Sequence, residues 1–483
     1  MTEELTFEKS HPSAPPPRLP ESGVEAAPRL PANLLRKRPP ALPRLSEPEV
    51  MRHYSRLASL NYSISENFYP LGSCTMKYNP VANEQAARLP GFAELHPYQD
   101  PETIQGALEL MWRLERALCE IAGVDRVTLQ PAAGAHGEWT ALRMIQAYHL
   151  ARGEERSEVI VPDAAHGTNP ASAALCGFRV VEVKSAPDGR VDVGDLEAKL
   201  SNRVAALMLT NPNTLGLFER QILEVSEMVH ATGAKLYYDG ANLNALMGIC
   251  RPGDMGFDAV HMNLHKTFTT PHGGGGPGSG PVGVKADLVP FLPRPTVERE
   301  NGRFFLDSER PQSIGRVRSF YGNFGMLVRA FTYIQAMGGD GLTQASKDAV
   351  LAANYVRKRL EGVLDLPHEG PCMHEFVASA RNLAPQGIKA LDLAKGLLER
   401  GFYAPTVYFP LIVPEAVMVE PTETESKATL DAFANALKEI VELARTDPDE
   451  LRAEPRSLPV GRLDEVRAAR HPVLRWRPDG ESG

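Results

Sequence analysis

Short apolar runs alternate with amphipathic segments between residues 126 and 285. The runs predict strands at 126–131, 158–162, 179–184, 204–212, 235–240, 257–263 and 280–285. The segments between them predict helices at 138–151, 170–176 and 219–231. Such an alternation is typical of an α/β domain whose mostly parallel sheet is covered on both faces. Catalytic side chains are therefore expected in loops at the carboxyl ends of the strands.

The pattern differs on both sides of this region. Upstream, Ser46 and Glu49 have capping-box spacing at the start of a predicted helix, and a long helix is expected at 103–121. Downstream, helical periods at 326–337, 343–362 and 388–400 predict a smaller α+β lobe. We therefore expect four parts: an N-terminal extended arm and helix (1–65), a large domain (66–325), a small C-terminal domain (326–446) and a tail (447–483).

The N-terminal 45 residues are rich in proline. They hold ten of the 41 prolines, including Pro15, Pro16 and Pro17, and cannot build a core of their own. A disordered tail is one interpretation of this composition. We favour an extended arm that wraps a partner subunit.

Composition narrows the class of protein. A chain of 483 residues, 43% of them hydrophobic, is too long to fold around a single hydrophobic core. No run approaches 18 apolar residues, and MTEELTFEKSH contains no apolar block, so neither a membrane span nor a secretory signal is expected. The net charge of −8 argues against nucleic-acid binding. Five cysteines without CxxC spacing favour reduced thiols in the cytoplasm and argue against a zinc site or other metal.

One lysine, Lys266, precedes six glycines within residues 273–280. A phosphate-binding P-loop needs its glycines before the lysine and a helix after it, and a dinucleotide fold needs a strand before its glycines. Neither context is present, which leaves an ordinary surface loop or a third interpretation. A lysine at a strand end can form a Schiff base with pyridoxal phosphate.

A Schiff-base site needs a carboxylate that keeps the pyridine nitrogen protonated. Asp239 ends the strand KLYYD, and Ala241 is small enough to lie under a flat ring. Taken alone, Asp239 could simply cap a turn. With Lys266 downstream, the role at the ring is the better interpretation.

A phosphate cradle is expected in LQPAAGAHGEW (129–139). The amides of Gly134, Ala135 and His136 would lie at the amino end of a helix, where an anion is attracted. His136 could also stack on the ring opposite Ala241, and His265 could donate to the phosphate. A tight strand-to-helix turn and a histidine facing water are the plain alternatives.

At this point the motifs resemble a known family. LQPAAGAHGE, AHGTNPASA, LTNPNTLGLFE, YYDGANLNA, NLHKTF, MVEPTETESK and NFYPLGSCTMKYNP are similar to glycine decarboxylase, the pyridoxal-phosphate P-protein of the glycine cleavage system. The resemblance runs from about residue 45 to 445. It matches the carboxyl-terminal half of the long single-chain form, so the chain resembles the catalytic subunit 2 of the split form.

The resemblance implies the aspartate-aminotransferase-like fold, fold type I. It also implies that the cofactor lysine is Lys266, the ring-nitrogen aspartate Asp239 and the stacking histidine His136. The expected partner is a homologous subunit 1, in a heterotetramer of two pairs. The expected reaction releases CO2 from glycine and transfers the aminomethyl group to the lipoyl arm of H-protein.

Further roles are expected for residues outside the ring contacts. The loop around Ser73, Thr75 and Lys77 is a candidate for lining the substrate mouth, and Thr168 for touching the cofactor or the substrate. A polar loop that satisfies its own backbone is the alternative. Cys74, in the same loop, is better interpreted as an inert thiol than as a redox group.

The glycines of 273–280 could let backbone approach the cofactor or let a segment move as the lipoyl arm enters, and a rigid crossing is the competing account. Another fold type I decarboxylase or a carbon–sulfur lyase would keep the same cofactor. A non-catalytic scaffold subunit would not need both Lys266 and Asp239.

Overall fold

The computed structural model describes residues 3–11, 13, 21, 23, 30–37, 40, 42–273 and 278–476. The chain divides into two compact units, residues 67–455 and residues 1–66 with 456–483. Among the described residues, no helix has the length and apolar character needed to cross a membrane. The expected boundaries at residues 65, 325 and 446 stay a prediction.

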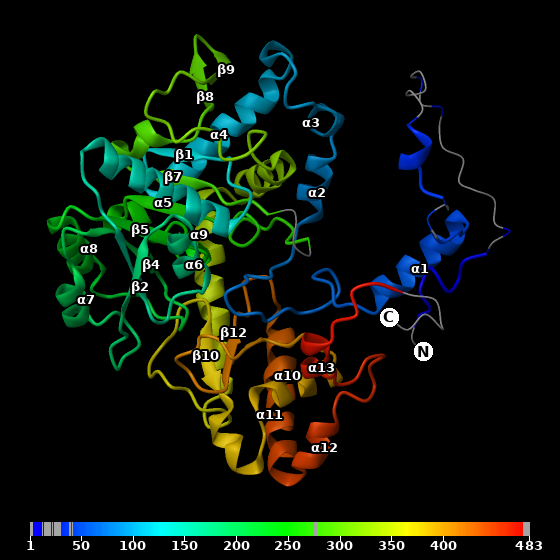
Figure 1. The fold of residues 1–483 in the computed structure, drawn as a ribbon. Coiled ribbons are helices and arrows are strands. Elements are labelled where there is room, and N and C mark those ends of the chain that lie inside the picture. The colour runs from blue at the N-terminus through cyan, green and yellow to red at the C-terminus, as the bar shows by residue number, and fades with distance from the viewer. Residues whose placement is uncertain are drawn as a thin grey trace. The chain divides into compact units, whose positions relative to one another are not determined.

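A seven-stranded sheet organises the first part of the larger unit (Figure 1). Its strands are β1 (Arg126–Thr128), β2 (Glu158–Pro162), β3 (Arg179–Val183), β4 (Val204–Thr210), β5 (Lys235–Gly240), β6 (Ala259–Met262) and β7 (Val282–Val284). Their spatial order is β1-β7-β6-β5-β4-β2-β3. The pairs from β3 to β6 are parallel, and β7 pairs antiparallel with β6 and β1. The predicted mostly parallel sheet is confirmed.

Burial on both faces explains why the strands are continuous apolar runs. Every residue of β4 is buried, and alternate side chains enter different clusters. Leu207 and Leu209 pack with one hydrophobic cluster, whereas Ala206 and Met208 pack with another. Each large apolar side chain buried in this way stabilises the fold by about 1.5–3 kcal/mol.

Helices cover both faces of this sheet. They are α2 (Val81–Ala87), α3 (Pro90–Ala93), α4 (Gln105–Ala122), α5 (Gly134–Ala151), α6 (Thr168–Leu175), α7 (Val193–Lys199) and α8 (Ile222–Ala231). Apolar residues of α4, α7 and α8 belong to one cluster, and those of α5 and α6 to the cluster on the opposite face. The predicted helices at 103–121, 138–151, 170–176 and 219–231 are confirmed within a few residues. Helix α7 and the hairpin β8 (Thr296–Glu300) with β9 (Arg303–Asp307) were not predicted.

A second cluster of elements completes the larger unit. It comprises α9 (Phe324–Arg359), β10 (Phe376–Ser379), α10 (Ala390–Glu399), β11 (Thr406–Val407), β12 (Ala416–Val419), α11 (Lys427–Thr446) and α12 (Pro448–Ala453). The three strands form an antiparallel sheet in the order β10-β12-β11. The two helices predicted between 326 and 362 are one element, α9, with non-helical backbone at Gly338. Leu451 of α12 is buried in the core of this part.

The smaller unit contains η1 (Ala32–Leu34), α1 (Glu47–Ser59) and α13 (Glu465–Arg470). The predicted capping box is confirmed, because the Ser46 backbone N–H donates to Glu49 Oε2 at 2.7 Å. Within this unit Phe7 stacks on Trp476 with ring centroids 4.8 Å apart. Pro15, Pro16 and Pro17 lie outside the described residues, so the wrapping arm stays a prediction.

Candidate functional site

The carboxyl end of β5 presents a buried aspartate. Asp239 Oδ2 accepts a hydrogen bond from Asn169 Nδ2 at 2.9 Å, and Oδ1 accepts one from the Ala241 N–H at 3.0 Å. His261 of the neighbouring strand β6 lies 3.6 Å from Oδ1. Burial by itself would raise the pKa of Asp239, but the nearby His261 and these hydrogen bonds outweigh burial and lower it. Asp239 is therefore ionised at neutral pH.

Lys266 lies four residues beyond β6, at the same edge of the sheet. Its Nζ donates to the Ser73 carbonyl oxygen at 2.8 Å. Ser73 belongs to a turn that rests on β12, because the Gly72 N–H donates to the Met418 carbonyl at 3.2 Å. A segment almost 200 residues upstream therefore holds the lysine amine.

Asp239 and Lys266 line one cavity of about 170 Å³. The predicted residues Ser73, Gly134, Ala135, Thr168, Ala241 and His265 line it as well. The predicted residues His136, Thr75 and Lys77 are not among its lining residues. The structure thus brings eight of the eleven predicted site residues to one cavity, and the role of each stays a prediction.

The turn before α5 passes close to neighbouring backbone and side chains. A Cβ at Gly134 would lie 2.7 Å from Asn263 Oδ1, and the Gly280 N–H donates to the Pro131 carbonyl at 3.0 Å. The first amides of a helix lack carbonyl partners within the helix, so those at the start of α5 are available to an anion. His136 is half-buried, and its Nδ1 accepts a hydrogen bond from the Ala132 N–H at 3.1 Å.

Glu138 was missed by the sequence-based interpretation. It lines the cavity, and its Oε1 accepts a hydrogen bond from Thr168 Oγ1 at 2.7 Å. Burial, followed by the charge of Asp239, raises the pKa of Glu138 to about 7. Two carboxyl groups of one cavity therefore differ at neutral pH, with Asp239 ionised and Glu138 about half protonated. The only sequence signal was an acid in the first turn of a predicted phosphate-binding helix.

Two histidines flank the lysine on the glycine-rich side. His265 and His272 have ring centroids 5.1 Å apart, and the Ser279 N–H donates to His265 Nδ1 at 3.3 Å. Burial and neighbouring positive charge lower the pKa of His265 to about 3 and that of His272 to about 4. Both rings are therefore neutral. Residues 274–277 lie outside the described residues, so the predicted movement of the glycine-rich segment stays a prediction.

The other members of the 73–77 segment have polar partners elsewhere. Thr75 donates from its hydroxyl to Glu420 Oε1 at 2.6 Å, and Lys77 Nζ donates to Glu423 Oε1 at 2.6 Å. Burial raises the pKa of Cys74, although the Lys266 charge opposes this, so Cys74 is held as a thiol. All five cysteines are free.

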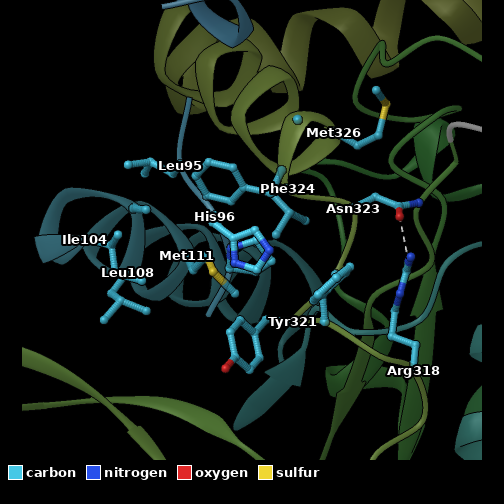
Figure 2. Close-up of a pocket in the computed structure, with 16 residues that line it drawn as sticks. Leu95, His96, Ile104, Leu108, Met111, Arg318, Tyr321, Asn323, Phe324 and Met326 are labelled. Carbon is cyan, nitrogen blue, oxygen red and sulfur yellow. Dashed lines mark hydrogen bonds between the residues drawn. The ribbon is translucent and has the colours of Figure 1, made fainter. Parts of the chain in front are cut away.

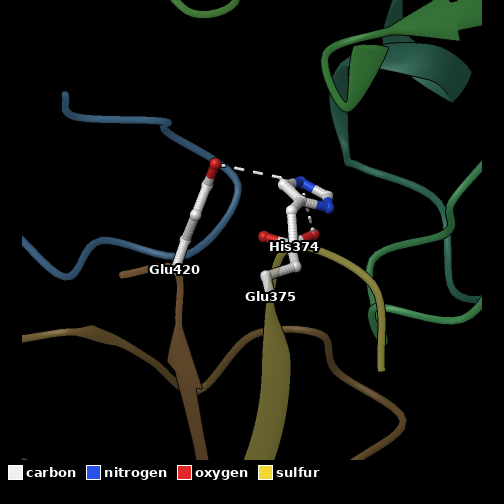
Figure 3. A group of neighbouring side chains, drawn as sticks. All are labelled: His374, Glu375 and Glu420. Atoms are coloured by element: carbon white, nitrogen blue, oxygen red, sulfur yellow. Dashed lines mark ion pairs between the residues drawn. The ribbon is translucent and has the colours of Figure 1, made fainter. Parts of the chain in front are cut away.

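Three buried titratable residues lie behind this segment (Figure 3). His374 and Glu375 precede β10, and Glu420 follows β12. Their ligand-type atoms all lie within 4.8 Å of one another. The sequence-based interpretation missed all three residues, because only the strand pairing brings them together.

A larger cavity of about 460 Å³ lies between α4 and the start of α9 (Figure 2). Its lining is mainly apolar and aromatic, with Arg318 Nη1 donating to Asn323 Oδ1 at 2.6 Å at one end. Among the described residues that line it, none is a lysine or a carboxylate. The lysine and carboxylates expected of a catalytic site line the Lys266 cavity instead, although the apolar cavity is larger.

Comparisons with known proteins agree on one family. The family model described as "Glycine cleavage system P-protein" matches residues 25–298, and that described as "Glycine dehydrogenase, C-terminal domain" matches residues 345–457. A "Probable glycine dehydrogenase (decarboxylating) subunit 2" from Caldanaerobacter subterraneus subsp. tengcongensis is 58% identical over 98% of each chain. Another with this description, from Thermotoga maritima, is 58% identical over 98% of this chain and 99% of its own.

Solved structures share the fold. A glycine decarboxylase (P-protein) of the glycine cleavage system, in inhibitor-bound form, has a TM-score of 0.72 and 22% identity, over 85% of this chain and 93% of its own. A cysteine desulfurase from Thermococcus onnurineus has a TM-score of 0.61 and 13% identity, over 78% of this chain and 95% of its own. These likenesses identify fold type I, as predicted.

Proposed function

Because this chain belongs to the glycine cleavage system P-protein family, as a subunit 2 of glycine dehydrogenase (decarboxylating), we propose that glycine loses CO2 in its Lys266 cavity. The enzyme is an oxidoreductase, its fold is that of pyridoxal-phosphate enzymes, and the description of its relatives as subunit 2 implies a subunit 1. The observation that carries the proposal is the convergence of an ionised Asp239 and Lys266 on one cavity.

The residues present fit pyridoxal phosphate. Thr210 Oγ1 and Asn263 Oδ1 are buried at the cavity with no hydrogen-bond partner among the described residues, which leaves them free for a polar ligand. The space beside Gly134 is one that a Cβ would fill. The amides at the start of α5 suit a phosphate, Asp239 suits a protonated ring nitrogen, and Lys266 suits the covalent link.

Bound pyridoxal phosphate supplies an electron sink for the bond that breaks. The protein residues then have separable roles. Asp239 holds the proton at the ring nitrogen, and Ala241 leaves room beside the ring. His265 would donate to the phosphate. His136 does not line the cavity, so it would stack on the ring only if its side chain turned toward the cavity. Thr168 contacts the cofactor or the substrate, with its hydroxyl oriented by Glu138.

The substrate side of the cavity is small and polar. Glycine has no side chain to recognise, so selectivity comes from lack of space and from a few polar contacts. Ser73 is placed at the cavity wall and is the residue of its segment best positioned to meet the substrate. Thr75 and Lys77 support that segment through Glu420 and Glu423.

The acceptor is the oxidised lipoyl arm of H-protein. The aminomethyl carbon bonds to one sulfur while the disulfide breaks, and the other sulfur takes up a proton to become a thiol. The reaction is therefore a two-electron reduction of the disulfide paired with loss of CO2 from glycine. Subunit 1 is the partner, in a heterotetramer of two pairs.

Two measurements test the proposal. Borohydride reduction of the cofactor-saturated protein, followed by peptide mass spectrometry, is expected to locate a pyridoxyl adduct on Lys266. Glycine and labelled bicarbonate are expected to exchange carbon in the presence of subunit 1 and lipoylated H-protein. An adduct at a different lysine refutes the site, and a normal adduct without exchange refutes the reaction.

The same experiments separate the alternatives. A non-catalytic scaffold would carry no adduct, and Lys266→Ala would change neither its colour nor its partner's activity. A carbon–sulfur lyase or another decarboxylase would carry the adduct but would not exchange bicarbonate with glycine.

A further inference from the structure

Strand pairing creates the cluster of His374, Glu375 and Glu420 shown in Figure 3. Phe376 of β10 pairs with Val419 of β12 in antiparallel register. Glu375 directly precedes Phe376 and Glu420 directly follows Val419, so the two glutamates lie at the same end of the sheet. All three side chains are fully buried.

The two glutamates hold the turn that contacts Lys266. Glu375 Oε2 accepts a hydrogen bond from the Ser73 N–H at 2.7 Å, and Glu420 Oε2 accepts one from the Thr75 N–H at 2.9 Å. Ser73 and Thr75 have φ values of 63° and 46°, a left-handed conformation that costs about 1–2 kcal/mol for a residue with a side chain. The two acids offset this strain and direct the Ser73 carbonyl at the Lys266 amine.

The imidazole of His374 lies between the two acids without a hydrogen bond. Its Nε2 is 3.9 Å from Glu375 Oε1 and 3.8 Å from Glu420 Oε1, and neither ring nitrogen has a hydrogen-bond partner among the described residues. Burial lowers the pKa of His374 to about 3, so the ring is neutral. It therefore provides no positive charge to balance the acids.

Two neighbouring carboxyl groups that are buried away from water do not readily ionise at the same time, because their negative charges repel each other. Burial, then the charge of Glu420, raises the pKa of Glu375, and burial raises the pKa of Glu420 to about 7.

Four other titratable groups face the cluster. They are Cys74 and Lys77 of the 67–80 segment, Lys266 of the loop after β6, and Glu423 of the loop after β12. Lys77 pairs with Glu423 at 2.6 Å. Lys266 forms no ion pair among the described residues, and its charge acts on both acids and on Asp239.

We propose that Glu375 and Glu420, with His374 between them, share one proton and act as positioning residues that hold the Ser73–Thr75 turn and control the protonation of Lys266. The proposal rests on the role of Lys266 as the cofactor lysine. The pair gains negative charge as the pH rises through about 7, the pKa of Glu420, and above it. Each charge favours the protonated form of a group at Lys266.

The same three side chains are ligand types that bind divalent metal ions. Lys266 and Lys77 place positive charge toward His374, which opposes binding of a cation. The carboxylate oxygens already accept hydrogen bonds from Ser73 and Thr75. A proton shared by Glu375 and Glu420 therefore explains the cluster better than a bound metal ion does.

The test is a pH titration of the visible absorption of the holoenzyme, measured for wild type, Glu375→Gln, Glu420→Gln and the double variant. Either single variant leaves one acid, whose pKa is still raised by burial, so the remaining charge develops as the pH rises. We expect each single variant to lower the highest-pH midpoint of the titration by about one unit, and the double variant by about two, because each charge removed acts in a poorly hydrated space. Glu158→Gln is the control. It removes a buried carboxylate at the amino end of β2, away from the carboxyl ends of the strands where Lys266 lies, and is expected to leave the titration unchanged.

The outcomes separate this inference from the proposed function. A wild-type protein with no visible cofactor absorption refutes the role of Lys266 itself. A normal wild-type absorption with midpoints unchanged in the double variant refutes the charge control. If the double variant does not fold, the two single variants decide. A stoichiometric metal ion that is lost in His374→Asn also overturns the proposal.

Discussion

Glu138→Gln removes a carboxyl that titrates near neutral pH and shares the Lys266 cavity with Asp239. The pKa of Glu138 rises from 4.5 to about 7 on folding, because of burial and then the charge of Asp239. The folded state therefore binds this proton more tightly than the unfolded state. The free energy of unfolding must fall as the pH rises from about 4.5 to about 7, and it stays reduced above that range. The shift corresponds to at most about 3 kcal/mol.

Glutamine has the same shape and can still accept the hydrogen bond from Thr168, but it has no charge. We expect Glu138→Gln to match the wild type near pH 4.5 and to exceed its free energy of unfolding by up to about 3 kcal/mol near pH 8. Urea unfolding of the cofactor-free protein, followed by tryptophan fluorescence across this pH range, measures the difference. Trp139 lies next to Glu138 and reports on α5.

Glu158→Gln is the matched control with the opposite sign. Hydrogen bonds from Arg203 and Arg179 lower the pKa of Glu158, so its stabilising contribution is present above its unfolded pKa and lost as the pH falls. Glu158→Gln should therefore be the less stable protein near neutral pH and approach the wild type in acid. If the Glu138→Gln and wild-type stabilities run parallel from about pH 4.5 to about pH 8, the reasoning about Glu138 is wrong.

Three further substitutions test other parts of the cavity. Asp239→Asn should lower kcat by about 10²–10⁴ while the protein stays folded, since the ring nitrogen loses its ionised partner; equal kcat would contradict this. Gly134→Ala puts a Cβ 2.7 Å from Asn263 Oδ1 and should weaken pyridoxal-phosphate binding about tenfold or more, measured by fluorescence titration, whereas unchanged affinity would place the cofactor elsewhere. Gly72→Ala puts a Cβ 2.8 Å from the Met418 carbonyl oxygen and should cost about 1–3 kcal/mol of stability, visible as a lower Tm; an unchanged Tm would mean that this turn yields easily.

The large sheet was predictable because its strands are buried on both faces. β4 and β5 are buried along their whole length, so each appears in the sequence as a short continuous apolar run. The prediction overran at β1, which ends at Thr128 rather than residue 131. There the chain leaves the sheet, and the Pro131 carbonyl accepts from Gly280.

Two elements were missed although the sequence carries their signals. Helix α11 begins after Ser426, which accepts a hydrogen bond from the Thr429 N–H, and its buried apolar residues recur every three or four positions. The β8–β9 hairpin turns at Asn301 and Gly302, a pair typical of tight hairpins. The break at Gly338 was predicted as the end of one helix and the start of another, but the two segments form one element.

Some residues of the candidate site could be predicted from the order of the strands, and others could not. Lys266, Asp239 and the turn at Gly134 follow strands of one parallel sheet, so their meeting could be expected from chain order alone. Glu138 and the acids Glu375 and Glu420 carried no such signal. Their significance comes from burial and from each other's charge, which depend on packing between distant segments.

The 67–80 segment shows why a polar loop can be essential to a buried lysine. Its residues are mostly half-buried or buried and form no regular strand, so the buried N–H groups need acceptors outside the segment. Glu375 and Glu420 supply them from the small antiparallel sheet, about 300 residues further along the chain. The loop in turn supplies the carbonyl that holds Lys266 at the edge of the large sheet. The two sheets are thus joined at the lysine by hydrogen bonds, so a change in either sheet that shifts this loop also shifts the amine.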